Sequence, residues 1–333
     1  MSDSTTTRLV LLGTAGGPLP SPVRAGISQA VVVGDRVHVI DCGSSVTRQL
    51  RRARLLSSLH QVFVTHLHSD HVCDYFNLFL CGWPILQWNP PIHVFGPGSA
   101  GDVSALPPEQ PEEDPIPVVI PANPTPGLAD LHAAQMASHA YDINIRMREA
   151  GRSDLSALVV PHEIAIPPET GARAPDLVAP PMEPILVTED DDVRVTAILV
   201  DHPPVFPAFA YRFDTDAGSI VVSGDTAPSA NLVRLATGAD ILVHEVFTDS
   251  PADVFPDDDD NWEARRRQHH LLSSHTPLSR VGSLATEAGV RRLVLTHFIP
   301  GDDDIPDERW VKGASADFDG EVVVGRDLLE LRL

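Results

Sequence analysis

The chain has 333 residues, of which 43% are hydrophobic, so it can bury a sizeable core and is too apolar for a disordered protein. Its 46 acidic residues outnumber 24 basic ones, and the net charge of −22 argues against a nucleic-acid partner, which would need a local basic patch because most of the surface would repel a phosphate backbone. Three cysteines cannot build a disulfide framework, and no segment has the roughly 18 consecutive apolar residues of a membrane span. We therefore expect a cytoplasmic globular protein that does not contact membranes.

The first hundred residues predict short strands that alternate with turns. Runs of β-branched and apolar residues, each bounded by Gly, Pro or Asp, are typical of strands. These runs occupy residues 8–12, 30–33, 36–40, 61–65 and 92–95. Residues 46–56 predict a helix with basic residues on its outer face.

The composition changes after residue 96. About half of the 31 prolines lie between residues 101 and 189, and proline interrupts both helices and central strands. We therefore interpret residues 99–189 as a proline-rich cap inserted into one domain that spans residues 1–333, with a single helix at 128–150. A disordered linker is the alternative. The aromatic residues just before the cap are candidates for the wall of a pocket beneath it, with core packing as the alternative: Phe79, Trp83 and Trp88.

Strand patterns return after the cap. The segment Asp216-Ala217-Gly218 predicts a hairpin turn between two of the strands. The predicted strands occupy residues 193–200, 209–213, 219–223, 241–244 and 292–296, and a helix is predicted at 278–288.

The strongest chemical signal lies directly after the strand that ends at Thr65, in the sequence His66-Leu67-His68-Ser69-Asp70-His71. Neutral imidazoles placed side by side in a core would each need a hydrogen-bond partner, whereas a metal ion satisfies them together. Alternation along the strand puts His66 and His68 on one side, and Asp70 and His71 can reach a second position. A surface turn that happens to be rich in histidine is the alternative.

This HxHxDH sequence resembles the signature of the metallo-β-lactamase superfamily. Further segments resemble the ribonuclease Z and arylsulfatase-like branch of that family: residues 11–17 and 40–43, His202 ahead of Tyr211-Arg212, Ser223-Gly224-Asp225-Thr226, and Leu295-Thr296-His297. The resemblance covers roughly residues 1–98 and 190–333. It implies an α/β fold in which four layers form an αββα sandwich, interrupted by the proline-rich insertion.

The resemblance also implies two metal ions. His66, His68 and His202 would hold the first ion, Asp70, His71 and His297 the second, and Asp225 would bridge them. Such a mixed set of nitrogen and oxygen ligands suits zinc, with manganese or iron as alternatives. Two ions about 3.5–4 Å apart share a hydroxide that acts as nucleophile near neutral pH. We expect other histidines to be exposed or hydrogen-bonded spectators: His132, His139, His162, His269 and His270.

Two further loops resemble parts of ribonuclease Z that transfer protons. They are Val243-His244-Glu245 and Ser274-His275-Thr276. By this resemblance His275 would donate a proton to the leaving group, and Glu245 and Asp70 would also act in catalysis. The alternative is that His275 caps the following helix together with Ser273 or Ser274.

Three functions remain open at this stage: a hydrolase of small esters, a ribonuclease Z-like phosphodiesterase that processes tRNA 3′ ends, and a non-catalytic binding module. Seven clustered ligands argue against the last. In ribonuclease Z an arm that grips tRNA separates the metal histidine from the bridging aspartate, whereas His202 and Asp225 are only 23 positions apart here, and the insertion is acidic. We therefore predict a dinuclear zinc hydrolase of a small-molecule substrate (an aryl ester, lactone, sulfate or phosphate ester). The predicted enzyme has no nucleic-acid partner, and a homodimer is the expectation for the family. The ribonuclease Z-like reading is the alternative.

Overall fold

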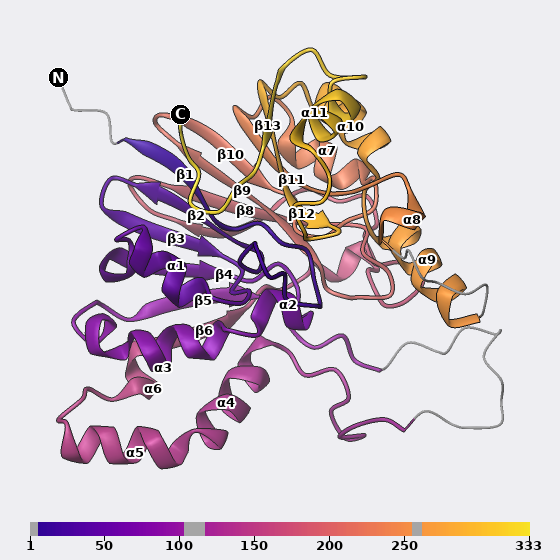
Figure 1. Ribbon diagram of the computed structural model, residues 1–333. Helices are drawn as coiled ribbons and strands as arrows, with labels where there is room; N and C mark the ends of the chain where they lie inside the picture. The colour runs from indigo at the N-terminus through magenta and orange to yellow at the C-terminus, as the bar shows by residue number, and fades with distance from the viewer. Residues whose placement is uncertain (1–5, 103–116, 255–261) are drawn as a thin grey trace.

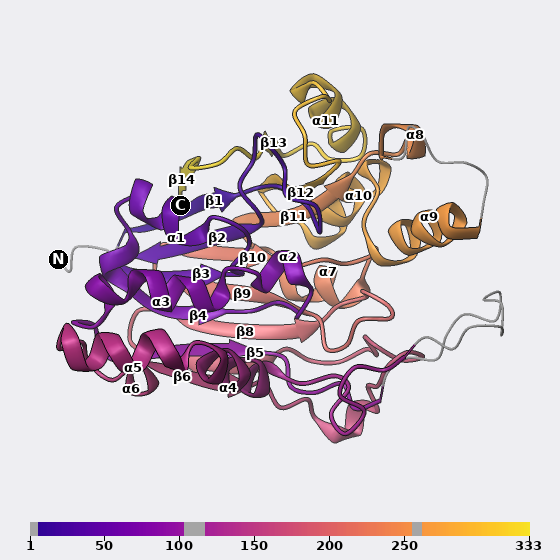
Figure 2. The ribbon, with the colours of Figure 1, turned by 60° about the horizontal axis from the view of Figure 1, so that its bottom comes forward.

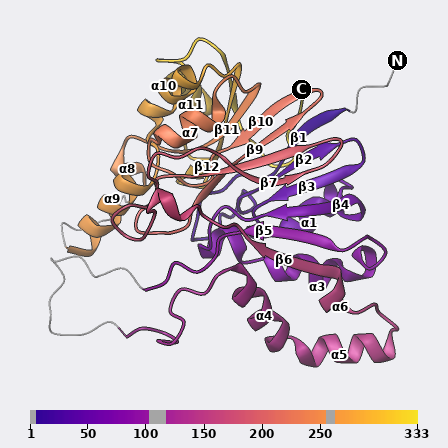
Figure 3. The ribbon, with the colours of Figure 1, turned by 180° about the vertical axis from the view of Figure 1, so that it is seen from behind.

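The computed structural model describes residues 6–102, 117–254 and 262–333. Two seven-stranded sheets face each other, and helices cover the outer face of each sheet (Figure 1, and from behind in Figure 3). The layers therefore run helix, sheet, sheet, helix, which confirms the predicted α/β sandwich.

The first sheet has the strand order β14-β1-β2-β3-β4-β5-β6. Its pairs are antiparallel from β14 to β3 and parallel from β3 to β6. The strands are β1 (Thr7–Gly13), β2 (Ser28–Val33), β3 (Arg36–Ile40), β4 (Leu59–Phe63), β5 (Ile92–Gly96), β6 (Val159–Glu163) and β14 (Glu330–Arg332).

The second sheet repeats this arrangement with the order β13-β12-β11-β10-β9-β8-β7. Its pairs are antiparallel from β7 to β10 and parallel from β10 to β13. The strands are β7 (Ile185–Glu189), β8 (Arg194–Leu199), β9 (Phe209–Thr215), β10 (Gly218–Val222), β11 (Ile241–Phe247), β12 (Arg292–Ile299) and β13 (Glu321–Val324).

Helices cover both outer faces (Figure 2). The side of the first sheet carries α1 (Val46–Arg52), α3 (Tyr75–Leu86), α4 (Leu128–Ser138), α5 (Ala140–Glu149) and α6 (Leu155–Leu158). The side of the second sheet carries α7 (Ala230–Ala236), α10 (Leu278–Ala288) and α11 (Asp307–Ala314). Shorter or peripheral helices are η1 (Leu56–Ser58), α2 (Ser69–Val72), η2 (Pro168–Thr170), α8 (Pro251–Val254) and α9 (Trp262–Ser274). None of the helices in the described ranges is long and apolar enough to span a membrane.

Strand β1 shows how alternation builds the layers. Leu9 and Leu11 pack in the core between the sheets, whereas Val10 and Leu12 pack in a second core beneath α1 and α3. Because successive side chains point to opposite faces and both faces are covered, the strand is a continuous apolar run.

The sequence located most strands within about two residues but missed α3. Its buried positions recur at helical spacing, and Pro84 within the helix obscured that pattern. Phe79 and Trp83 are fully buried in the core under α3, so they do not line a pocket, and Trp88 is exposed. The helix predicted over 128–150 is divided in two at His139.

Residues 99–189 contribute to both sheets. Strands β6 and β7 lie in this range and form the edge of the first and second sheet, where proline is tolerated. Gly101 pairs with Thr125, so these two residues lie side by side although 24 positions separate them. Residues 103–116 of the predicted cap lie outside the described residues, and the covering role of the segment stays a prediction.

Candidate metal centre

The fold brings all seven predicted metal ligands to one edge of the sandwich. Four of them follow β4: His66, His68, Asp70 and His71. His202 follows β8, Asp225 follows β10 and His297 lies near the end of β12. The loops that follow these strands all lie at one edge of the two facing sheets, so their side chains meet there. Up to 231 positions separate these side chains in the sequence (297 − 66).

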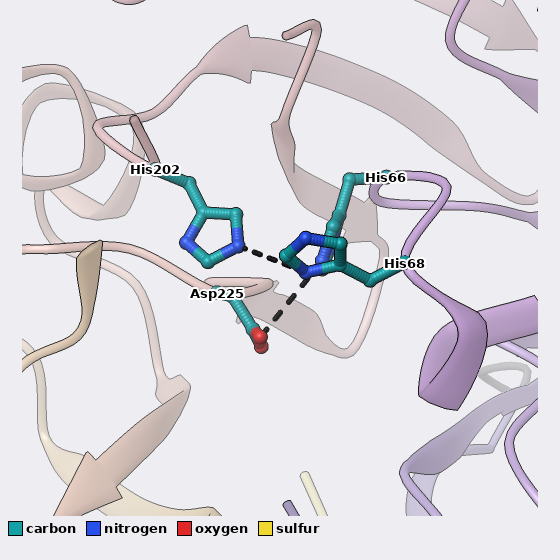
Figure 4. A group of neighbouring side chains, drawn as sticks. All are labelled: His66, His68, His202 and Asp225. Carbon is teal, nitrogen blue, oxygen red and sulfur yellow. Dashed lines mark hydrogen bonds and ion pairs between the residues drawn. The ribbon is translucent and has the colours of Figure 1, made fainter. Parts of the chain in front are cut away.

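The first cluster comprises His66, His68, His202 and Asp225 (Figure 4). Its ligand atoms all lie within 4.8 Å of one another. His202 Nε2 is 3.3 Å from His68 Nδ1, and His66 Nε2 is 3.8 Å from Asp225 Oδ2. The four side chains converge on one point, as the ligands of a single ion do.

The second cluster comprises Asp70, His71, Asp225 and His297, again within 4.8 Å. His71 Nε2 is 3.3 Å from Asp225 Oδ1, and His297 Nε2 is 3.3 Å from both Asp225 Oδ2 and Asp70 Oδ2. Asp225 therefore belongs to both clusters, as a residue that bridges two ions would.

The backbone at two of these positions is unusual. His297 is an extra residue where the pairing of β11 and β12 shifts register, and its φ of 45° lies in the left-handed region. Such a bulge redirects a side chain, here toward Asp70 and Asp225. Gly224 precedes Asp225 with φ 60°, and a Cβ there would lie 2.7 Å from the carbonyl oxygen of Phe209. Only glycine fits where the backbone comes this close to the carbonyl oxygen of Phe209.

The donor set fits a pair of divalent cations. His66 Nε2, His71 Nε2 and Asp225 Oδ1 are buried and have no hydrogen-bond partner among the described residues. Buried polar atoms without partners are costly, and a pair of cations, one in each cluster, would satisfy all three. Burial lowers the pKa of His66 and His202, which keeps both rings in the neutral form that binds metal. Burial also opposes a charge on His71, but the carboxylates of Asp225, Asp41 and Asp70 outweigh it and raise the pKa of His71.

A second layer of contacts orients the predicted ligands. Asp41 Oδ2 accepts a hydrogen bond of 2.8 Å from His71 Nδ1, and the same oxygen accepts one from the Thr65 hydroxyl. Thr65 Oγ1 also lies 3.1 Å from His66 Nδ1. Contacts of this kind set the tautomer and orientation of metal-binding imidazoles. We had assigned no role to Asp41 from the sequence, although its position at the end of a buried strand could have indicated one at the site.

The predicted proton donor lies beside the second cluster. His275 Nδ1 donates to Glu245 Oε2 over 2.9 Å, and Glu245, His275 and His297 form a third group of ligand atoms within 4.8 Å. Burial opposes a charge on His275, but the Glu245 carboxylate raises its pKa to about 9. The capping alternative is wrong, because Pro277 is the N-cap of α10 and no side chain caps that helix.

Among the histidines interpreted as spectators, His270 differs from the rest. His132 bonds to the Tyr75 hydroxyl at 3.0 Å and His162 to His93 at 2.8 Å, both away from the site, while His269 is exposed. The ring of His270, by contrast, lies within 6.3 Å of the rings of three site histidines: His68, His202 and His275. Burial, helped by His275 and His68, lowers the pKa of His270 to about 4.

A cavity of about 190 Å³ opens next to Asp70. It is lined by residues 15–21 of the loop after β1, together with Gly26, Ser44, Ser69, Asp70 and Cys73. Gly17 lies so close that a Cβ there would be 2.2 Å from Asp70 Cβ. The loop after β1 therefore forms a wall of the cavity beside Asp70.

The comparisons with known proteins agree with this architecture. The sequence matches the family described as Metallo-beta-lactamase superfamily over residues 23–270. Proteins named ribonuclease Z from Mycobacterium bovis (strain BCG / Pasteur 1173P2) and Mycobacterium avium (strain 104) are 30% and 32% identical over 324 residues, and each match covers 96% of both chains.

Two solved structures share the fold. The metallo-beta-lactamase fold protein YhfI from Bacillus subtilis superposes with a TM-score of 0.63 at 18% identity, covering 98% of this chain and all of its own. The short form of human tRNase Z also gives a TM-score of 0.63, at 19% identity, covering 97% of this chain and 98% of its own. At such identities the likeness concerns the fold.

The relatives correct one of our expectations. We inferred from the net charge that the chain has no nucleic-acid partner, yet relatives that match 96% of it are named ribonuclease Z. The inference was wrong because net charge averages over the entire surface, whereas a phosphodiester is met locally by cations in the site.

The family match covers most of the chain, and the fold and the two clusters of histidine and carboxylate groups agree with it. The chain therefore belongs to the metallo-beta-lactamase superfamily, as a metal-dependent hydrolase related to proteins named ribonuclease Z.

Proposed function

We propose that the protein is a ribonuclease Z-like phosphodiesterase that cleaves RNA, with the 3′ end of precursor tRNA as its substrate. The observation that carries the proposal is the hydrogen-bonded pair of His275 and Glu245 beside the two ligand clusters. Relatives named ribonuclease Z, matched over 96% of both chains, support it.

The two clusters would hold one divalent cation each. His66, His68 and His202 would bind the first ion and Asp70, His71 and His297 the second, with Asp225 between them. We propose zinc, because neutral imidazoles dominate the donor set. Two such ions, when bound, supply an activated water and offset the charge that develops at phosphorus.

The pair of His275 and Glu245 supports a substrate whose leaving group is an alkoxide. When a phosphodiester of RNA is cleaved with a ribose 3′-oxygen leaving, that oxygen departs as a strongly basic alkoxide and needs a proton. His275 can donate it from Nε2, since Nδ1 is bonded to Glu245. A phenolate leaves without such help, so a built-in proton donor supports the RNA reading over aryl esters.

Because this chain lacks the arm with which ribonuclease Z grips tRNA, RNA would have to be held by other parts of the protein. Between His202 and Asp225 the chain forms the hairpin of β9 and β10, which belongs to the second sheet. The substrate would therefore be gripped by other surfaces near the site, such as the loop after β1 that lines the cavity beside Asp70.

The proposal is tested with purified protein, a precursor tRNA that carries a 3′ trailer, and metal analysis of each variant. We expect close to two ions per chain and cleavage at the 3′ end, and His68→Ala and Asp225→Ala should each lose at least one ion and the cleavage. His269→Ala, a change at an exposed histidine, serves as the control. Metal-loaded protein that hydrolyses aryl esters but leaves every RNA intact would overturn the proposal, and full metal retention in both variants would overturn the ligand assignment.

A further inference from the structure

His270 lies over the site without belonging to either ligand cluster. It lies four residues before the end of α9 and is half-buried. The centre of its ring is 6.3 Å from that of His68, 6.0 Å from that of His202 and 5.7 Å from that of His275, to which it is perpendicular. Among the described residues, the groups whose ligand atoms lie close enough to share an ion do not include His270. The geometry therefore leaves it free for a role toward the substrate.

The hydrogen bonds of Ser274 determine which nitrogen of His270 carries a proton. The Ser274 hydroxyl donates to the carbonyl oxygen of Pro203, so its proton is already used. The contact of 3.2 Å between His270 Nδ1 and Ser274 Oγ must then be donated by the imidazole. In a neutral ring, the ordinary form at neutral pH, this leaves a lone pair on Nε2. No hydrogen bond joins Nε2 to any part of the chain that the structure describes.

A hydrogen-bond acceptor at this place can bind only those groups of an RNA substrate that donate a hydrogen bond. An acceptor repels the oxygens of a phosphate, so His270 does not serve as a phosphate contact. The ribose offers a donor in its 2′-hydroxyl, on the carbon next to the one that carries the 3′-oxygen. When His275 reaches the leaving 3′-oxygen, the neighbouring hydroxyl lies on the same edge of the sugar, within reach of a second imidazole close to His275.

We propose that His270 Nε2 accepts a hydrogen bond from the 2′-hydroxyl of the nucleotide whose 3′-oxygen leaves. This contact makes the site prefer a ribonucleotide over a deoxyribonucleotide at the scissile position. The inference rests on the proposed function, because it assigns one residue to one group of an RNA substrate.

The test removes the acceptor of His270 and the 2′-hydroxyl of the substrate, each separately and both together. One substrate is a precursor tRNA, and the other is the same molecule with a single 2′-deoxyribose at the cleaved nucleotide. His270→Phe keeps a planar ring without an acceptor, and His270→Gln keeps an acceptor oxygen. His269→Phe places the same ring at the adjacent exposed position as the matched control. The ratio of kcat/KM for the two substrates, compared between variants, isolates the interaction of the pair.

We expect His270→Phe to reduce the ribose preference by roughly 3- to 10-fold, the size of one neutral hydrogen bond, and to leave metal content unchanged. His270→Gln should keep part of the preference and His269→Phe all of it. Binding gives a second readout. An oligonucleotide that ends in a 2′,3′-diol should lose affinity in His270→Phe relative to wild type, and one that ends in a 2′-deoxyribose should not.

Equal ribose preference in wild type and His270→Phe would overturn the inference while RNA cleavage itself still stands. A wild-type protein that neither cleaves nor binds RNA would overturn the proposed function, and the inference with it. The two failures are distinguishable because the first appears only in the variant and the second already in the wild type.

Discussion

Glu245 and His275 are joined through Nδ1 of the imidazole, over 2.9 Å to Oε2 and 3.1 Å to Oε1 of the carboxylate. Both side chains are buried, and Glu245 also accepts a hydrogen bond from the backbone N–H of Thr226, next to Asp225. The carboxylate thus links the imidazole to the loop that carries the predicted bridging residue. This arrangement stabilises the charged ring and leaves Nε2 as the nitrogen that can serve a substrate.

Replacing His275 with Ala should lower kcat for substrates with an alkoxide leaving group by roughly 10²-fold or more, because general acid catalysis is of that size. Metal content should stay intact. Substrates with a nitrophenolate leaving group should lose much less, since they depart without a proton. Steady-state kinetics on both substrate types checks this, and equal losses for both would make His275 a structural residue.

Replacing Asp41 with Asn should weaken metal binding by roughly 10- to 100-fold, because the charged acceptor behind His71 is lost. Asn suits the backbone here, since Asp41 has a φ of 59° and Asn tolerates the left-handed region. Competition with a chromogenic chelator measures the affinity. Asp35→Asn, at an exposed position in the β2–β3 turn, is the control. The same affinity in both variants would show that Asp41 does not support the site.

Replacing residues 102–124 with an Asn-Gly turn tests the predicted cap. The ends can be joined because Gly101 and Thr125 already pair, with the Thr125 hydroxyl donating to the carbonyl oxygen of Gly101. If the segment covers the site, KM should rise or turnover should stop while both metal ions remain. Unchanged kinetics would show that the segment has no part in substrate binding.

The buried imidazole of His38 should make the protein less stable in acid. Burial, aided by the nearby His60, lowers its pKa to about 4 from 6.5. Between these two pH values the unfolded chain binds the proton and the folded protein does not. The contribution of neutral His38 to the unfolding free energy is therefore complete above about pH 6.5 and is lost as the pH falls toward 4. The difference corresponds to about 3 kcal/mol of unfolding free energy.

Urea unfolding at a series of pH values, with chelator in every sample, measures the contribution of His38. His38→Gln should show a shallower loss of unfolding free energy on acidification than wild type, whereas His269→Gln, at an exposed position, should follow wild type. Parallel curves for His38→Gln and wild type would contradict the assignment.

The fold class and the seven proposed ligands could be predicted from the sequence before the fold was known. Strands buried on both faces are continuous apolar runs, so β1 to β5 could be located from local composition. The cluster from His66 to His71 is local as well, because one strand end supplies four side chains. The remaining ligands, His202, Asp225 and His297, came from the order of motifs that resemble a known family.

The other side chains that reach the site, and the places where the insertion joins the two sheets, became visible only in the folded chain. Asp41 and His270 carry no distinctive spacing, and their contacts join segments brought together by sheet pairing and by the packing of α9. The insertion forms two edge strands, β6 and β7, because pairing partners on both sheets were open to it. Net charge misled us about RNA for the same physical reason: it sums over the whole chain, whereas a substrate meets only the groups that folding gathers at one point.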